Sequence, residues 1–347
     1  MNQISGHTNI NSLRTGRDCA RDIGCELGKF VVTTMEIPWN LSKERIGGNP
    51  EAVVMVETME ENWLEQQLLL IPPCDTVVGI GGGQAIDAAK YISWKRGIRL
   101  VSIPTILSVD AFVTPAAGIR RNHQVVYVGE SSPDPLVIDF NLLRTAPPEL
   151  NVAGIGDLLS IHTGTFDWEY AHSKGRSEYP FSSSDIARAR KILENLYPLL
   201  HDIRYNTDKG LMSIVEGFMT VNTICLPAGH YRVEEGSEHF LFYELEERLA
   251  RPFVHGYIVG MGIYLMSQLQ DNHFEMIRDV MNRVGLKYHP VDLGLSRKDL
   301  TDSLLNLKNY VTRKPGIWYS VINDSGITQA WIEQAVSGLR FPPARAV

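Results

Sequence analysis

The sequence is poor in the features that mark secreted, membrane-bound and nucleic-acid-binding proteins. Its four cysteines, at positions 19, 25, 74 and 225, form no CxxC pair and no framework spacing. We therefore expect free thiols in a reducing compartment, which favours the cytoplasm. No run approaches the ~18 consecutive apolar residues of a membrane span, and the polar first residues lack the apolar core of a signal peptide. The formal net charge is −7 and no basic run occurs, which argues against a nucleic-acid surface.

Several catalytic signatures are also missing. The chain has no GxSxG motif, no Walker loop, no HExxH metal motif and no Cys/His pairing. The remaining composition is that of an ordinary soluble protein, with 44% hydrophobic and 21% charged residues over 347 positions. At roughly 150 residues per domain, this length allows two domains. We expect a small-molecule partner, without nucleic acid or membrane.

The first half of the chain alternates strand and helix patterns. Short runs rich in valine and isoleucine predict strands at 29–34, 51–57, 76–80, 99–104 and 135–140. Helices are predicted at 17–27, 60–70 and 85–94, with Gly28 as the glycine that ends the first. We expect irregular chain at 37–50, and a hairpin at 116–129 with Arg121-Asn122-His123 at its tip. Alternation of this kind indicates a parallel sheet with helices on both faces.

Beyond residue 147 the strand signals disappear. Apolar spacing typical of helices predicts them at 182–200, 211–226, 236–249, 255–270, 275–284, 297–312 and 327–338. Ser296, with Asp299 three residues later, is predicted to cap the helix at 297. The predicted fold is therefore an α/β N-terminal domain with a Rossmann-like parallel sheet, residues 1–147, plus an all-α C-terminal domain, residues 148–347.

The chain is organised around residues 75–90, DTVVGIGGGQAIDAAK. A buried strand runs into four glycines, at positions 79, 81, 82 and 83, and a helix follows. This arrangement lets backbone N–H groups and a helix N-terminus approach a pyrophosphate, because glycine has no Cβ to block the approach. The spacing is GxGGG and not the GxGxxG of the common dinucleotide fingerprint. A bare glycine turn of an α/β protein is the alternative interpretation.

A second polar segment, PTILSVD, follows the strand at 99–104. It leaves the sheet where open α/β folds place ligand contacts, beyond the carboxyl end of a strand. Thr105 and Ser108 could hydrogen-bond a cofactor, and Asp110 could hold a substrate hydroxyl. A turn with an Asp cap explains the same residues equally well.

Three potential metal ligands lie in the helical half. Asp157 stands in NVAGIGDLLS, His239 in GSEHFLF, and His255 sixteen residues later in HGYIVG. One carboxylate and two imidazoles leave a coordination position open, as catalytic zinc sites do. Their spacing alone does not separate ligands from core or surface histidines. Asp167, Trp168 and His162 are expected on the same helix as Asp157, as packing or lining residues, whereas His172 and His201 are expected to be exposed.

Taken together, these segments resemble the family of iron-containing alcohol dehydrogenases, which includes glycerol dehydrogenase and glycerol-1-phosphate dehydrogenase. The motifs that carry the resemblance run in order over roughly residues 29 to 325: GIGGGQAIDAAKY, SIPTILSVDAFVTPAAGI, VAGIGDLLS, TFDWEYA, GSEHFLF and HGYIVGMG. They are most similar to the glycerol-1-phosphate dehydrogenase branch, through GDLLS, DWEYA and GSEH. The 3-dehydroquinate synthases share the fold, so a dehydroquinate synthase-like architecture is implied.

The resemblance implies roles for particular residues. NAD or NADP would contact Gly81, Gly82, Gly83, Gln84, Ala85, Ile86, Asp87, Thr105, Ile106, Leu107, Ser108 and Thr114, the last in place of a serine. One divalent metal, usually zinc and in some members nickel or iron, would be held by Asp157, His239 and His255. Asp110 and Asp157 would act in catalysis and contact the substrate, together with the positions of His162 and Tyr243. A homo-oligomer is also expected.

Three departures from the family pattern fall near the expected substrate. The family's GSEHxFSH ends in a histidine that contacts substrate, and this chain has Tyr243 there. Ser108-Val109-Asp110-Ala111 replaces SHDG, and Ser160-Ile161-His162-Thr163 replaces SNYT. The substrate is therefore left open between glycerol 1-phosphate and related molecules. Thr34 replaces an Asp common in NAD-specific relatives, which removes a repulsion against the 2′-phosphate of NADP.

The resulting hypothesis is reversible hydride transfer between nicotinamide C4 and a carbonyl carbon of a small polyol, sugar or its phosphate, with a metal to polarise the carbonyl. Asp110 would orient a hydroxyl, and the proton would leave through water or His162. A sugar phosphate cyclase of the dehydroquinate synthase type, a lyase that uses NAD transiently, is the alternative. A non-catalytic dinucleotide- or metabolite-binding protein is a third.

Overall fold

A computed structural model describes residues 9–121 and 124–343 of the chain. Its contacts divide the chain into two compact units. The first runs to Asn151 and includes Asn206–Asn222, and the second comprises Val152–Tyr205 and the chain from Thr223 onward. Of the three boundaries, one falls within α5 (Pro148–Leu159), one within α9 (Asp208–Ala228) and one between Tyr205 and Asn206, just before α9. The expected domain division at residue 147 stays a prediction.

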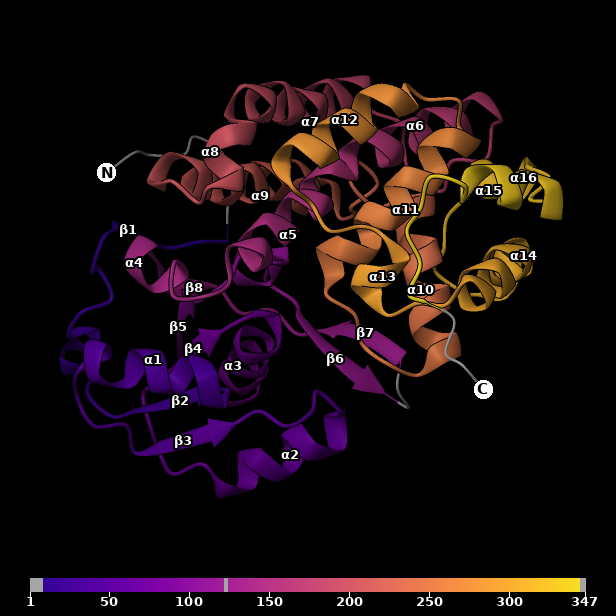
Figure 1. The fold of residues 1–347 in the computed structure, drawn as a ribbon. Helices are drawn as coiled ribbons and strands as arrows, with labels where there is room; N and C mark the ends of the chain where they lie inside the picture. The colour runs from indigo at the N-terminus through magenta and orange to yellow at the C-terminus, as the bar shows by residue number, and fades with distance from the viewer. Residues whose placement is uncertain (1–8, 122–123, 344–347) are drawn as a thin grey trace. The chain divides into compact units, whose positions relative to one another are not determined.

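The first unit is built on a six-stranded parallel sheet in the order β1-β8-β5-β4-β2-β3 (Figure 1). Its strands are β1 (Leu13–Gly16), β2 (Phe30–Thr34), β3 (Ala52–Met55), β4 (Thr76–Gly81), β5 (Arg99–Pro104) and β8 (Pro133–Asp139). Five of them confirm predicted strands. A separate antiparallel hairpin, β6 (Ala117–Arg121) with β7 (Gln124–Val128), confirms the predicted one. Two residues of its expected tip, Asn122 and His123, lie outside the described residues.

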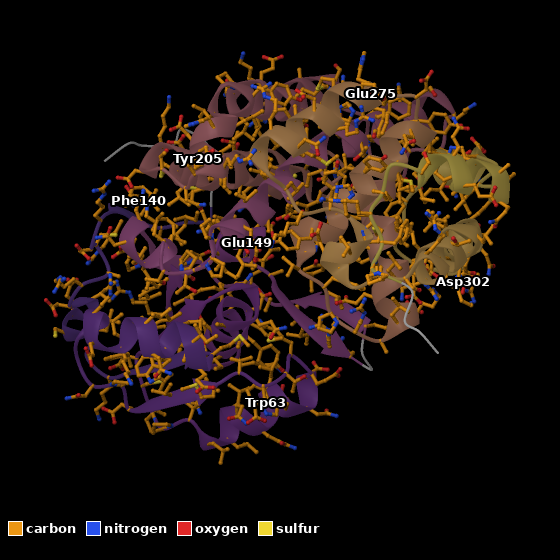
Figure 2. All side chains as sticks on the ribbon, in the orientation of Figure 1. Trp63, Phe140, Glu149, Tyr205, Glu275 and Asp302 are labelled. Atoms are coloured by element: carbon orange, nitrogen blue, oxygen red, sulfur yellow. The ribbon has the colours of Figure 1, made fainter. Side chains whose placement is uncertain are left out.

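Both faces of this sheet are buried, as expected of a parallel sheet. Alternate residues of a strand point to opposite faces. Val32 and Ile80 therefore pack into one apolar cluster, whereas Val31 and Val77 pack into another. Trp63, labelled in Figure 2, contributes to the second cluster from α2 (Glu61–Leu70). The main helix on the sheet is α3 (Gly83–Arg96), whose N-terminus adjoins the end of β4.

Two predictions for the first unit are wrong. Residues 37–50 contain a helix, α1 (Glu36–Ile46). Pro38 is its third residue, in the first turn, where a backbone N–H has no intrahelical partner to lose. Residues 17–27 form no α-helix, because Asp18 and Asp22 take positive φ angles, and only a short 3-10 helix, η1 (Ile23–Glu26), is present. Short helices η2 (Asp110–Phe112) and α4 (Phe140–Leu143) complete this part of the unit.

The described residues of the second unit form no strand, which confirms the prediction of a helical half. Its helices are α6 (Ile161–Ser173), α7 (Ser183–Leu196), η3 (Tyr197–Leu199), α8 (Leu200–Arg204), α10 (Ser237–Leu249), α11 (His255–Leu269), α12 (Phe274–Val284), α13 (Pro290–Leu293), α14 (Arg297–Arg313), α15 (Val321–Asp324) and α16 (Gln329–Ala335). Ser296 and Asp299 cap α14 reciprocally, as predicted. The parallel sheet followed by helices confirms the predicted fold class.

Helix α9 is the one described helix that is long and apolar enough to cross a membrane. Of its most apolar window, 67% is buried inside the protein. Such burial is typical of the core helix of a soluble protein. Helix α9 therefore confirms the predicted buried helix at 211–226.

Candidate functional site

The glycine turn joins β4 to α3 with very little space for side chains. Gly81 has φ +150°, and a Cβ there would lie 2.8 Å from the Cβ of Ala85. A Cβ on Gly82 would lie 2.7 Å from Cδ1 of Ile106. No side chain caps α3 at Gly82, and the first N–H groups of a helix have no intrahelical acceptor. The turn therefore presents backbone N–H groups at a helix N-terminus, which suits a phosphate.

The segment 105–108 lies beside this turn. Gly81 and Pro104 are register partners on the adjacent parallel strands β4 and β5, so both strands end at the same edge of the sheet. Thr105 N donates to Gly81 O at 2.9 Å, and Leu107 N donates to Asn151 Oδ1 at 3.1 Å. The structure thus brings together the two stretches expected to contact the cofactor.

A buried lysine that the sequence analysis did not single out ties Thr114 to this arrangement. Lys90 Nζ lies 2.7 Å from Asp87 Oδ1 and donates to Thr114 Oγ1 at 3.3 Å and to Ala116 O at 2.6 Å. Burial raises the pKa of Asp87, and the positive charge of Lys90 opposes this shift. The signal for Lys90 was available in the sequence, since DAAK places opposite charges three residues apart in an otherwise apolar helix.

Thr34 and Asp110 are the remaining first-unit residues of interest. Thr34 is fully buried, and its Oγ1 donates to Ile80 O at 2.8 Å. Its side chain is thus engaged with the backbone of β4. Asp110 begins η2, and its carbonyl accepts hydrogen bonds from Val113 N at 2.8 Å and Thr114 N at 3.2 Å. Asp110 and Thr114 therefore share one turn.

In the second unit the three predicted metal ligands converge. His255 Nε2 lies 3.1 Å from Asp157 Oδ1, and His239 Nε2 lies 3.3 Å from the same oxygen. The two Nε2 atoms are 3.3 Å apart. Asp157 comes from the end of α5, His239 from the first turn of α10, and His255 begins α11. Three helices that are distant in sequence therefore present one oxygen and two nitrogens to a common point.

Asp157 Oδ1, His239 Nε2 and His255 Nε2 form a triangle, the metal triangle, whose size fits three ligands of a tetrahedral metal. Zinc binds imidazole nitrogen and carboxylate oxygen at about 2.0–2.2 Å, so neighbouring ligands on a tetrahedron are about 3.3–3.5 Å apart. The three sides of the triangle, 3.1, 3.3 and 3.3 Å, are close to this separation. Asp157 and His239 are buried and His255 is half-buried. These residues therefore fit a metal with one position left for another ligand.

Glu238 contacts a candidate metal ligand, although its place in the sequence predicted no role for it. Its Oε1 accepts a hydrogen bond from His239 Nδ1 at 2.9 Å and one from Gly236 N at 2.6 Å. The bond to Nδ1 fixes the tautomer of His239 and leaves Nε2 as the ligand atom, a recurring arrangement around zinc-binding histidines. Glu238 directly precedes His239 in the chain, but adjacency alone does not reveal such a contact.

The charges in the triangle support one another. Burial opposes ionisation of Asp157, but His255 and His239 outweigh it and lower the pKa of Asp157. Burial likewise disfavours the cation at His239, but hydrogen bonds to Asp157 and Glu238 raise its pKa well above the ordinary value. Burial raises the pKa of Glu235, which lies in the same electrostatic environment. Two carboxylates, Asp157 and Glu238, thus contact His239, and negative charge at this point attracts a divalent cation.

The two other residues expected at the substrate lie on different helices. Tyr243 is one turn after His239 on α10, and their ring centres are 6.3 Å apart. His162 donates from Nε2 to Asn272 O at 2.8 Å, so this nitrogen is engaged, and burial lowers the pKa of its ring. The expectation that His162, Asp167 and Trp168 share a helix with Asp157 is wrong. Helix α5 ends at Leu159 and α6 begins at Ile161, because Ser160 interrupts them.

Known proteins resemble this chain over most of its length. The model of the iron-containing alcohol dehydrogenase family matches residues 35–147. A glycerol-1-phosphate dehydrogenase (NAD(P)+) of Aeropyrum pernix is 28% identical over 274 residues, which cover 79% of this chain and 75% of that protein. A protein of the same name from Methanothermobacter thermautotrophicus is 25% identical over 327 residues, 92% of each chain.

Solved structures agree in fold. A probable glycerol dehydrogenase from Sinorhizobium meliloti 1021 matches with a TM-score of 0.70 and 21% identity, and the match covers 94% of this chain and 95% of that chain. Glycerol dehydrogenase from Schizosaccharomyces pombe matches with a TM-score of 0.68 and 20% identity, covering 97% and 94%. The resemblance is therefore confirmed: residues 35–147 carry the pattern of the iron-containing alcohol dehydrogenase family, and the chain is related over most of its length to glycerol-1-phosphate dehydrogenases.

Proposed function

We propose that this protein is a metal-dependent NAD(P)(H) oxidoreductase that interconverts a small polyol or polyol phosphate and its ketone. The observation that carries this proposal is the triangle of Asp157, His239 and His255. Its sides match a tetrahedral divalent metal, and its ligand set leaves a position open. Relatives named glycerol-1-phosphate dehydrogenase (NAD(P)+) support the reaction class.

The metal site would serve a carbonyl or alcohol oxygen. A bound divalent ion, with zinc favoured over nickel or iron by the ligand set, would supply Lewis acidity to that oxygen. Asp157 and the two imidazoles hold the ion. Glu238 keeps Nδ1 of His239 protonated, so that Nε2 remains a donor to the metal. Asp157 is ionised, because its pKa is lowered by His255 and His239.

The glycine turn would hold the pyrophosphate of NAD or NADP. The first N–H groups of α3, which no side chain caps, would donate to the anion, and Gly81 and Gly82 would permit its close approach. Thr105 and Ser108 follow β5, the strand that pairs with β4, and would line the same cofactor site. A reduced nicotinamide held by this turn would supply a hydride to the carbonyl carbon, and solvent would supply the proton, so that the products would be the alcohol and NAD(P)+. Thr34 places no acidic group at the end of β2, so both cofactors are expected to bind.

Asp110, His162 and Tyr243 are proposed to contact the substrate. Tyr243 carries a phenol where the family carries an imidazole, one turn beyond His239. A phenol is larger and remains uncharged at neutral pH, so it would change which substituent fits beside the metal. We therefore propose a small ketone or ketone phosphate as the substrate class, with dihydroxyacetone phosphate as the first to be tested. We also propose that the protein is cytoplasmic and forms a homo-oligomer, which sedimentation velocity would test.

The decisive experiment is an NADH and NADPH oxidation screen with zinc or nickel added. Substrates would be dihydroxyacetone phosphate, dihydroxyacetone and other small ketones and aldehydes. Loss of absorbance at the nicotinamide band with one of them supports the dehydrogenase. A sugar phosphate cyclase would consume its substrate with no net change in that band, because its NAD is regenerated. Purified protein that binds neither metal nor nicotinamide cofactor would contradict both enzymes.

A further inference from the structure

The carboxylate of Asp167 makes two contacts that the proposed chemistry does not use. Asp167 lies on α6 and is fully buried. Its Oδ2 accepts a hydrogen bond from Ser237 N at 2.7 Å, and its Oδ1 accepts one from Val321 N at 2.9 Å. Ser237 is the first residue of α10, and Val321 is the first residue of α15. One side chain therefore holds the N-termini of two helices.

Helix α10 has no cap of its own. Its N-cap residue is Gly236, which has no side chain to accept a hydrogen bond from the first turn. Helix α15 differs, because the hydroxyl of Ser320 accepts from Ile322 N within its own segment. The carboxylate from α6 thus replaces the missing cap only at α10, the helix that carries His239.

The backbone at this point is shaped to admit the carboxylate. A Cβ on Gly236 would lie 2.7 Å from Asp167 Oδ2 and 2.9 Å from the Cα of Gly164 on α6. Both distances are shorter than real Cβ contacts, so a side chain at position 236 would displace Asp167. Gly236 therefore explains both features: it has no side chain to cap α10, and it leaves space for the carboxylate of Asp167.

Arg232 fixes the other side of Asp167. The guanidinium is fully buried and donates from Nη1 and Nη2 to Tyr319 O, each at 3.1 Å. Nη2 also donates to the carbonyl of Asp167 at 3.4 Å. The segment that carries Tyr319 and Val321 is therefore held to the backbone and to the side chain of Asp167. These contacts fix the place at which the carboxylate of Asp167 accepts the hydrogen bond from Ser237 N.

We propose that Asp167 is a positioning residue that fixes the first turn of α10, and through it the imidazole of His239, for metal binding. This inference rests on the proposed metal-dependent function. His239 is the third residue of α10, and its Nδ1 donates to Glu238, whose Oε1 also accepts from Gly236 N. The imidazole is thus oriented by Glu238, which Gly236 N holds, and Asp167 holds the adjoining backbone N–H of Ser237.

The test measures zinc affinity of the metal-free full-length protein by competition with a chromogenic chelator. Asp167→Asn keeps the size of the side chain but offers one acceptor oxygen for two N–H donors. We expect zinc binding about 10- to 100-fold weaker than wild type, as for other groups that orient metal ligands. The visible spectrum of the Co²⁺-loaded variant should also change, because the ligand geometry changes.

Two serine caps provide matched controls in the same unit. Ser182→Ala removes the cap of α7, which carries no metal ligand, since the Ser182 hydroxyl accepts from Asp185 N at 3.2 Å. Ser320→Ala removes the local cap of α15 and leaves the contact between Asp167 and Ser237 in place. Both variants should bind zinc within about twofold of wild type and keep the Co²⁺ spectrum.

The proposal is overturned if folded Asp167→Asn binds zinc like wild type, or if Ser320→Ala weakens zinc binding as much. A wild type that binds no divalent metal would contradict the proposed function itself, which is a different outcome. If Asp167→Asn does not fold, hydrogen exchange of the wild type decides. Slow exchange of the Ser237 amide, comparable to that of the Val321 amide, supports the capping contact, and exchange at loop rates excludes it.

Discussion

The glycine turn of the first unit and the metal triangle of the second unit are constructed in opposite ways. The turn works by the absence of side chains, since Gly81 and Gly82 have no room for a Cβ and leave backbone N–H groups exposed to a ligand. The triangle consists of three side chains. Glu238 accepts a hydrogen bond from one of them, His239, and Asp167 is proposed to position His239 through the backbone N–H of Ser237. Backbone geometry forms one site and side-chain electrostatics forms the other.

Because the two sites are constructed differently, we expect them to tolerate different substitutions. A backbone site has no titrating group of its own, so pH and charge changes nearby should affect it little, whereas an added methyl group should damage it. A buried ionic site is tolerant of small volume changes but loses its ligand when one charge or donor is removed. Mutations in the two units should therefore separate cleanly between cofactor affinity and metal content.

The largest effect is expected at His239. His239→Ala removes one of three donors, so the variant should lose its metal and its turnover should fall by on the order of 10³-fold or more, the equivalent of several kcal/mol. Metal analysis of the purified protein and the NAD(P)H oxidation assay measure both. His201→Ala, at an exposed position on α8, is the control and should change neither. A His239→Ala enzyme that kept metal and rate would refute the metal site, and cofactor affinity should survive in either case.

The buried pair Lys90–Asp87 tests whether buried charge also matters in the first unit, whose candidate site consists of backbone groups. Lys90→Met leaves Asp87 without its counter-charge, and we expect a loss of about 3–5 kcal/mol in the free energy of unfolding. Urea unfolding measures this loss, and the metal content should not change. Lys95→Met on the same helix removes a more exposed pair, with Glu65 at 2.7 Å, and should cost less than about 1 kcal/mol. Equal losses in the two variants would show that the burial of Lys90 has no special role.

The strands of the first unit could be predicted because buried parallel strands leave short runs that are largely apolar or β-branched, such as 29–34 and 99–104. Strand β1 was missed because it is a short edge strand with polar, exposed positions. Helix α1 was missed because it buries only Ser42 and Ile46 and therefore lacks an apolar stripe.

The two sites were predictable to different degrees for a related reason. The glycines that form the turn are nearly contiguous, so the sequence displays them together. The metal ligands are dispersed, with His255 and Asp157 lying 98 residues apart. They could be grouped as candidates by residue type, but their spacing did not separate them from core or surface histidines until the family resemblance was added. Glu238 and Asp167 could not be assigned in this way, because their contacts with His239 and Ser237 depend on how α6 and α10 pack.

The pH dependence of stability should expose the cost of burying charge in the second unit. Burial, reinforced by the charge of Glu238, raises the pKa of Asp167 to about 6. An unfolded Asp titrates near ~3.9, so the folded state binds the extra proton between about pH 4 and 6. The stability that this group contributes is therefore fully present below pH ~4 and is lost as pH rises through 6, by up to about 3 kcal/mol.

Chemical denaturation of wild type and Asp167→Asn at pH 4.5, 5.5, 6.5 and 7.5 measures this linkage. The stability advantage of wild type should be greatest at the lowest pH and shrink as pH rises, because the variant has no carboxylate to titrate. Ser320→Ala provides the control, since it alters the same helix terminus without removing a titrating group. An advantage that grows with pH would mean that the hydrogen bonds from Ser237 and Val321 lower the pKa of Asp167 more than burial raises it.

The smallest expected effect tests the glycine turn. Gly81→Ala forces an L side chain to φ +150° and places its Cβ 2.8 Å from Ala85, so about 1–3 kcal/mol of strain should result. We expect KM for NAD(P)H to rise about 10-fold, with wild-type metal content. Gly97→Ala is the matched control at the other end of α3, because Gly97 also has positive φ, +64°, but has open space where a Cβ would be. It should lose some stability and keep its KM. If both variants raised KM equally, the effect would come from backbone strain in α3, and the close approach of a ligand to the turn would no longer be needed to explain it.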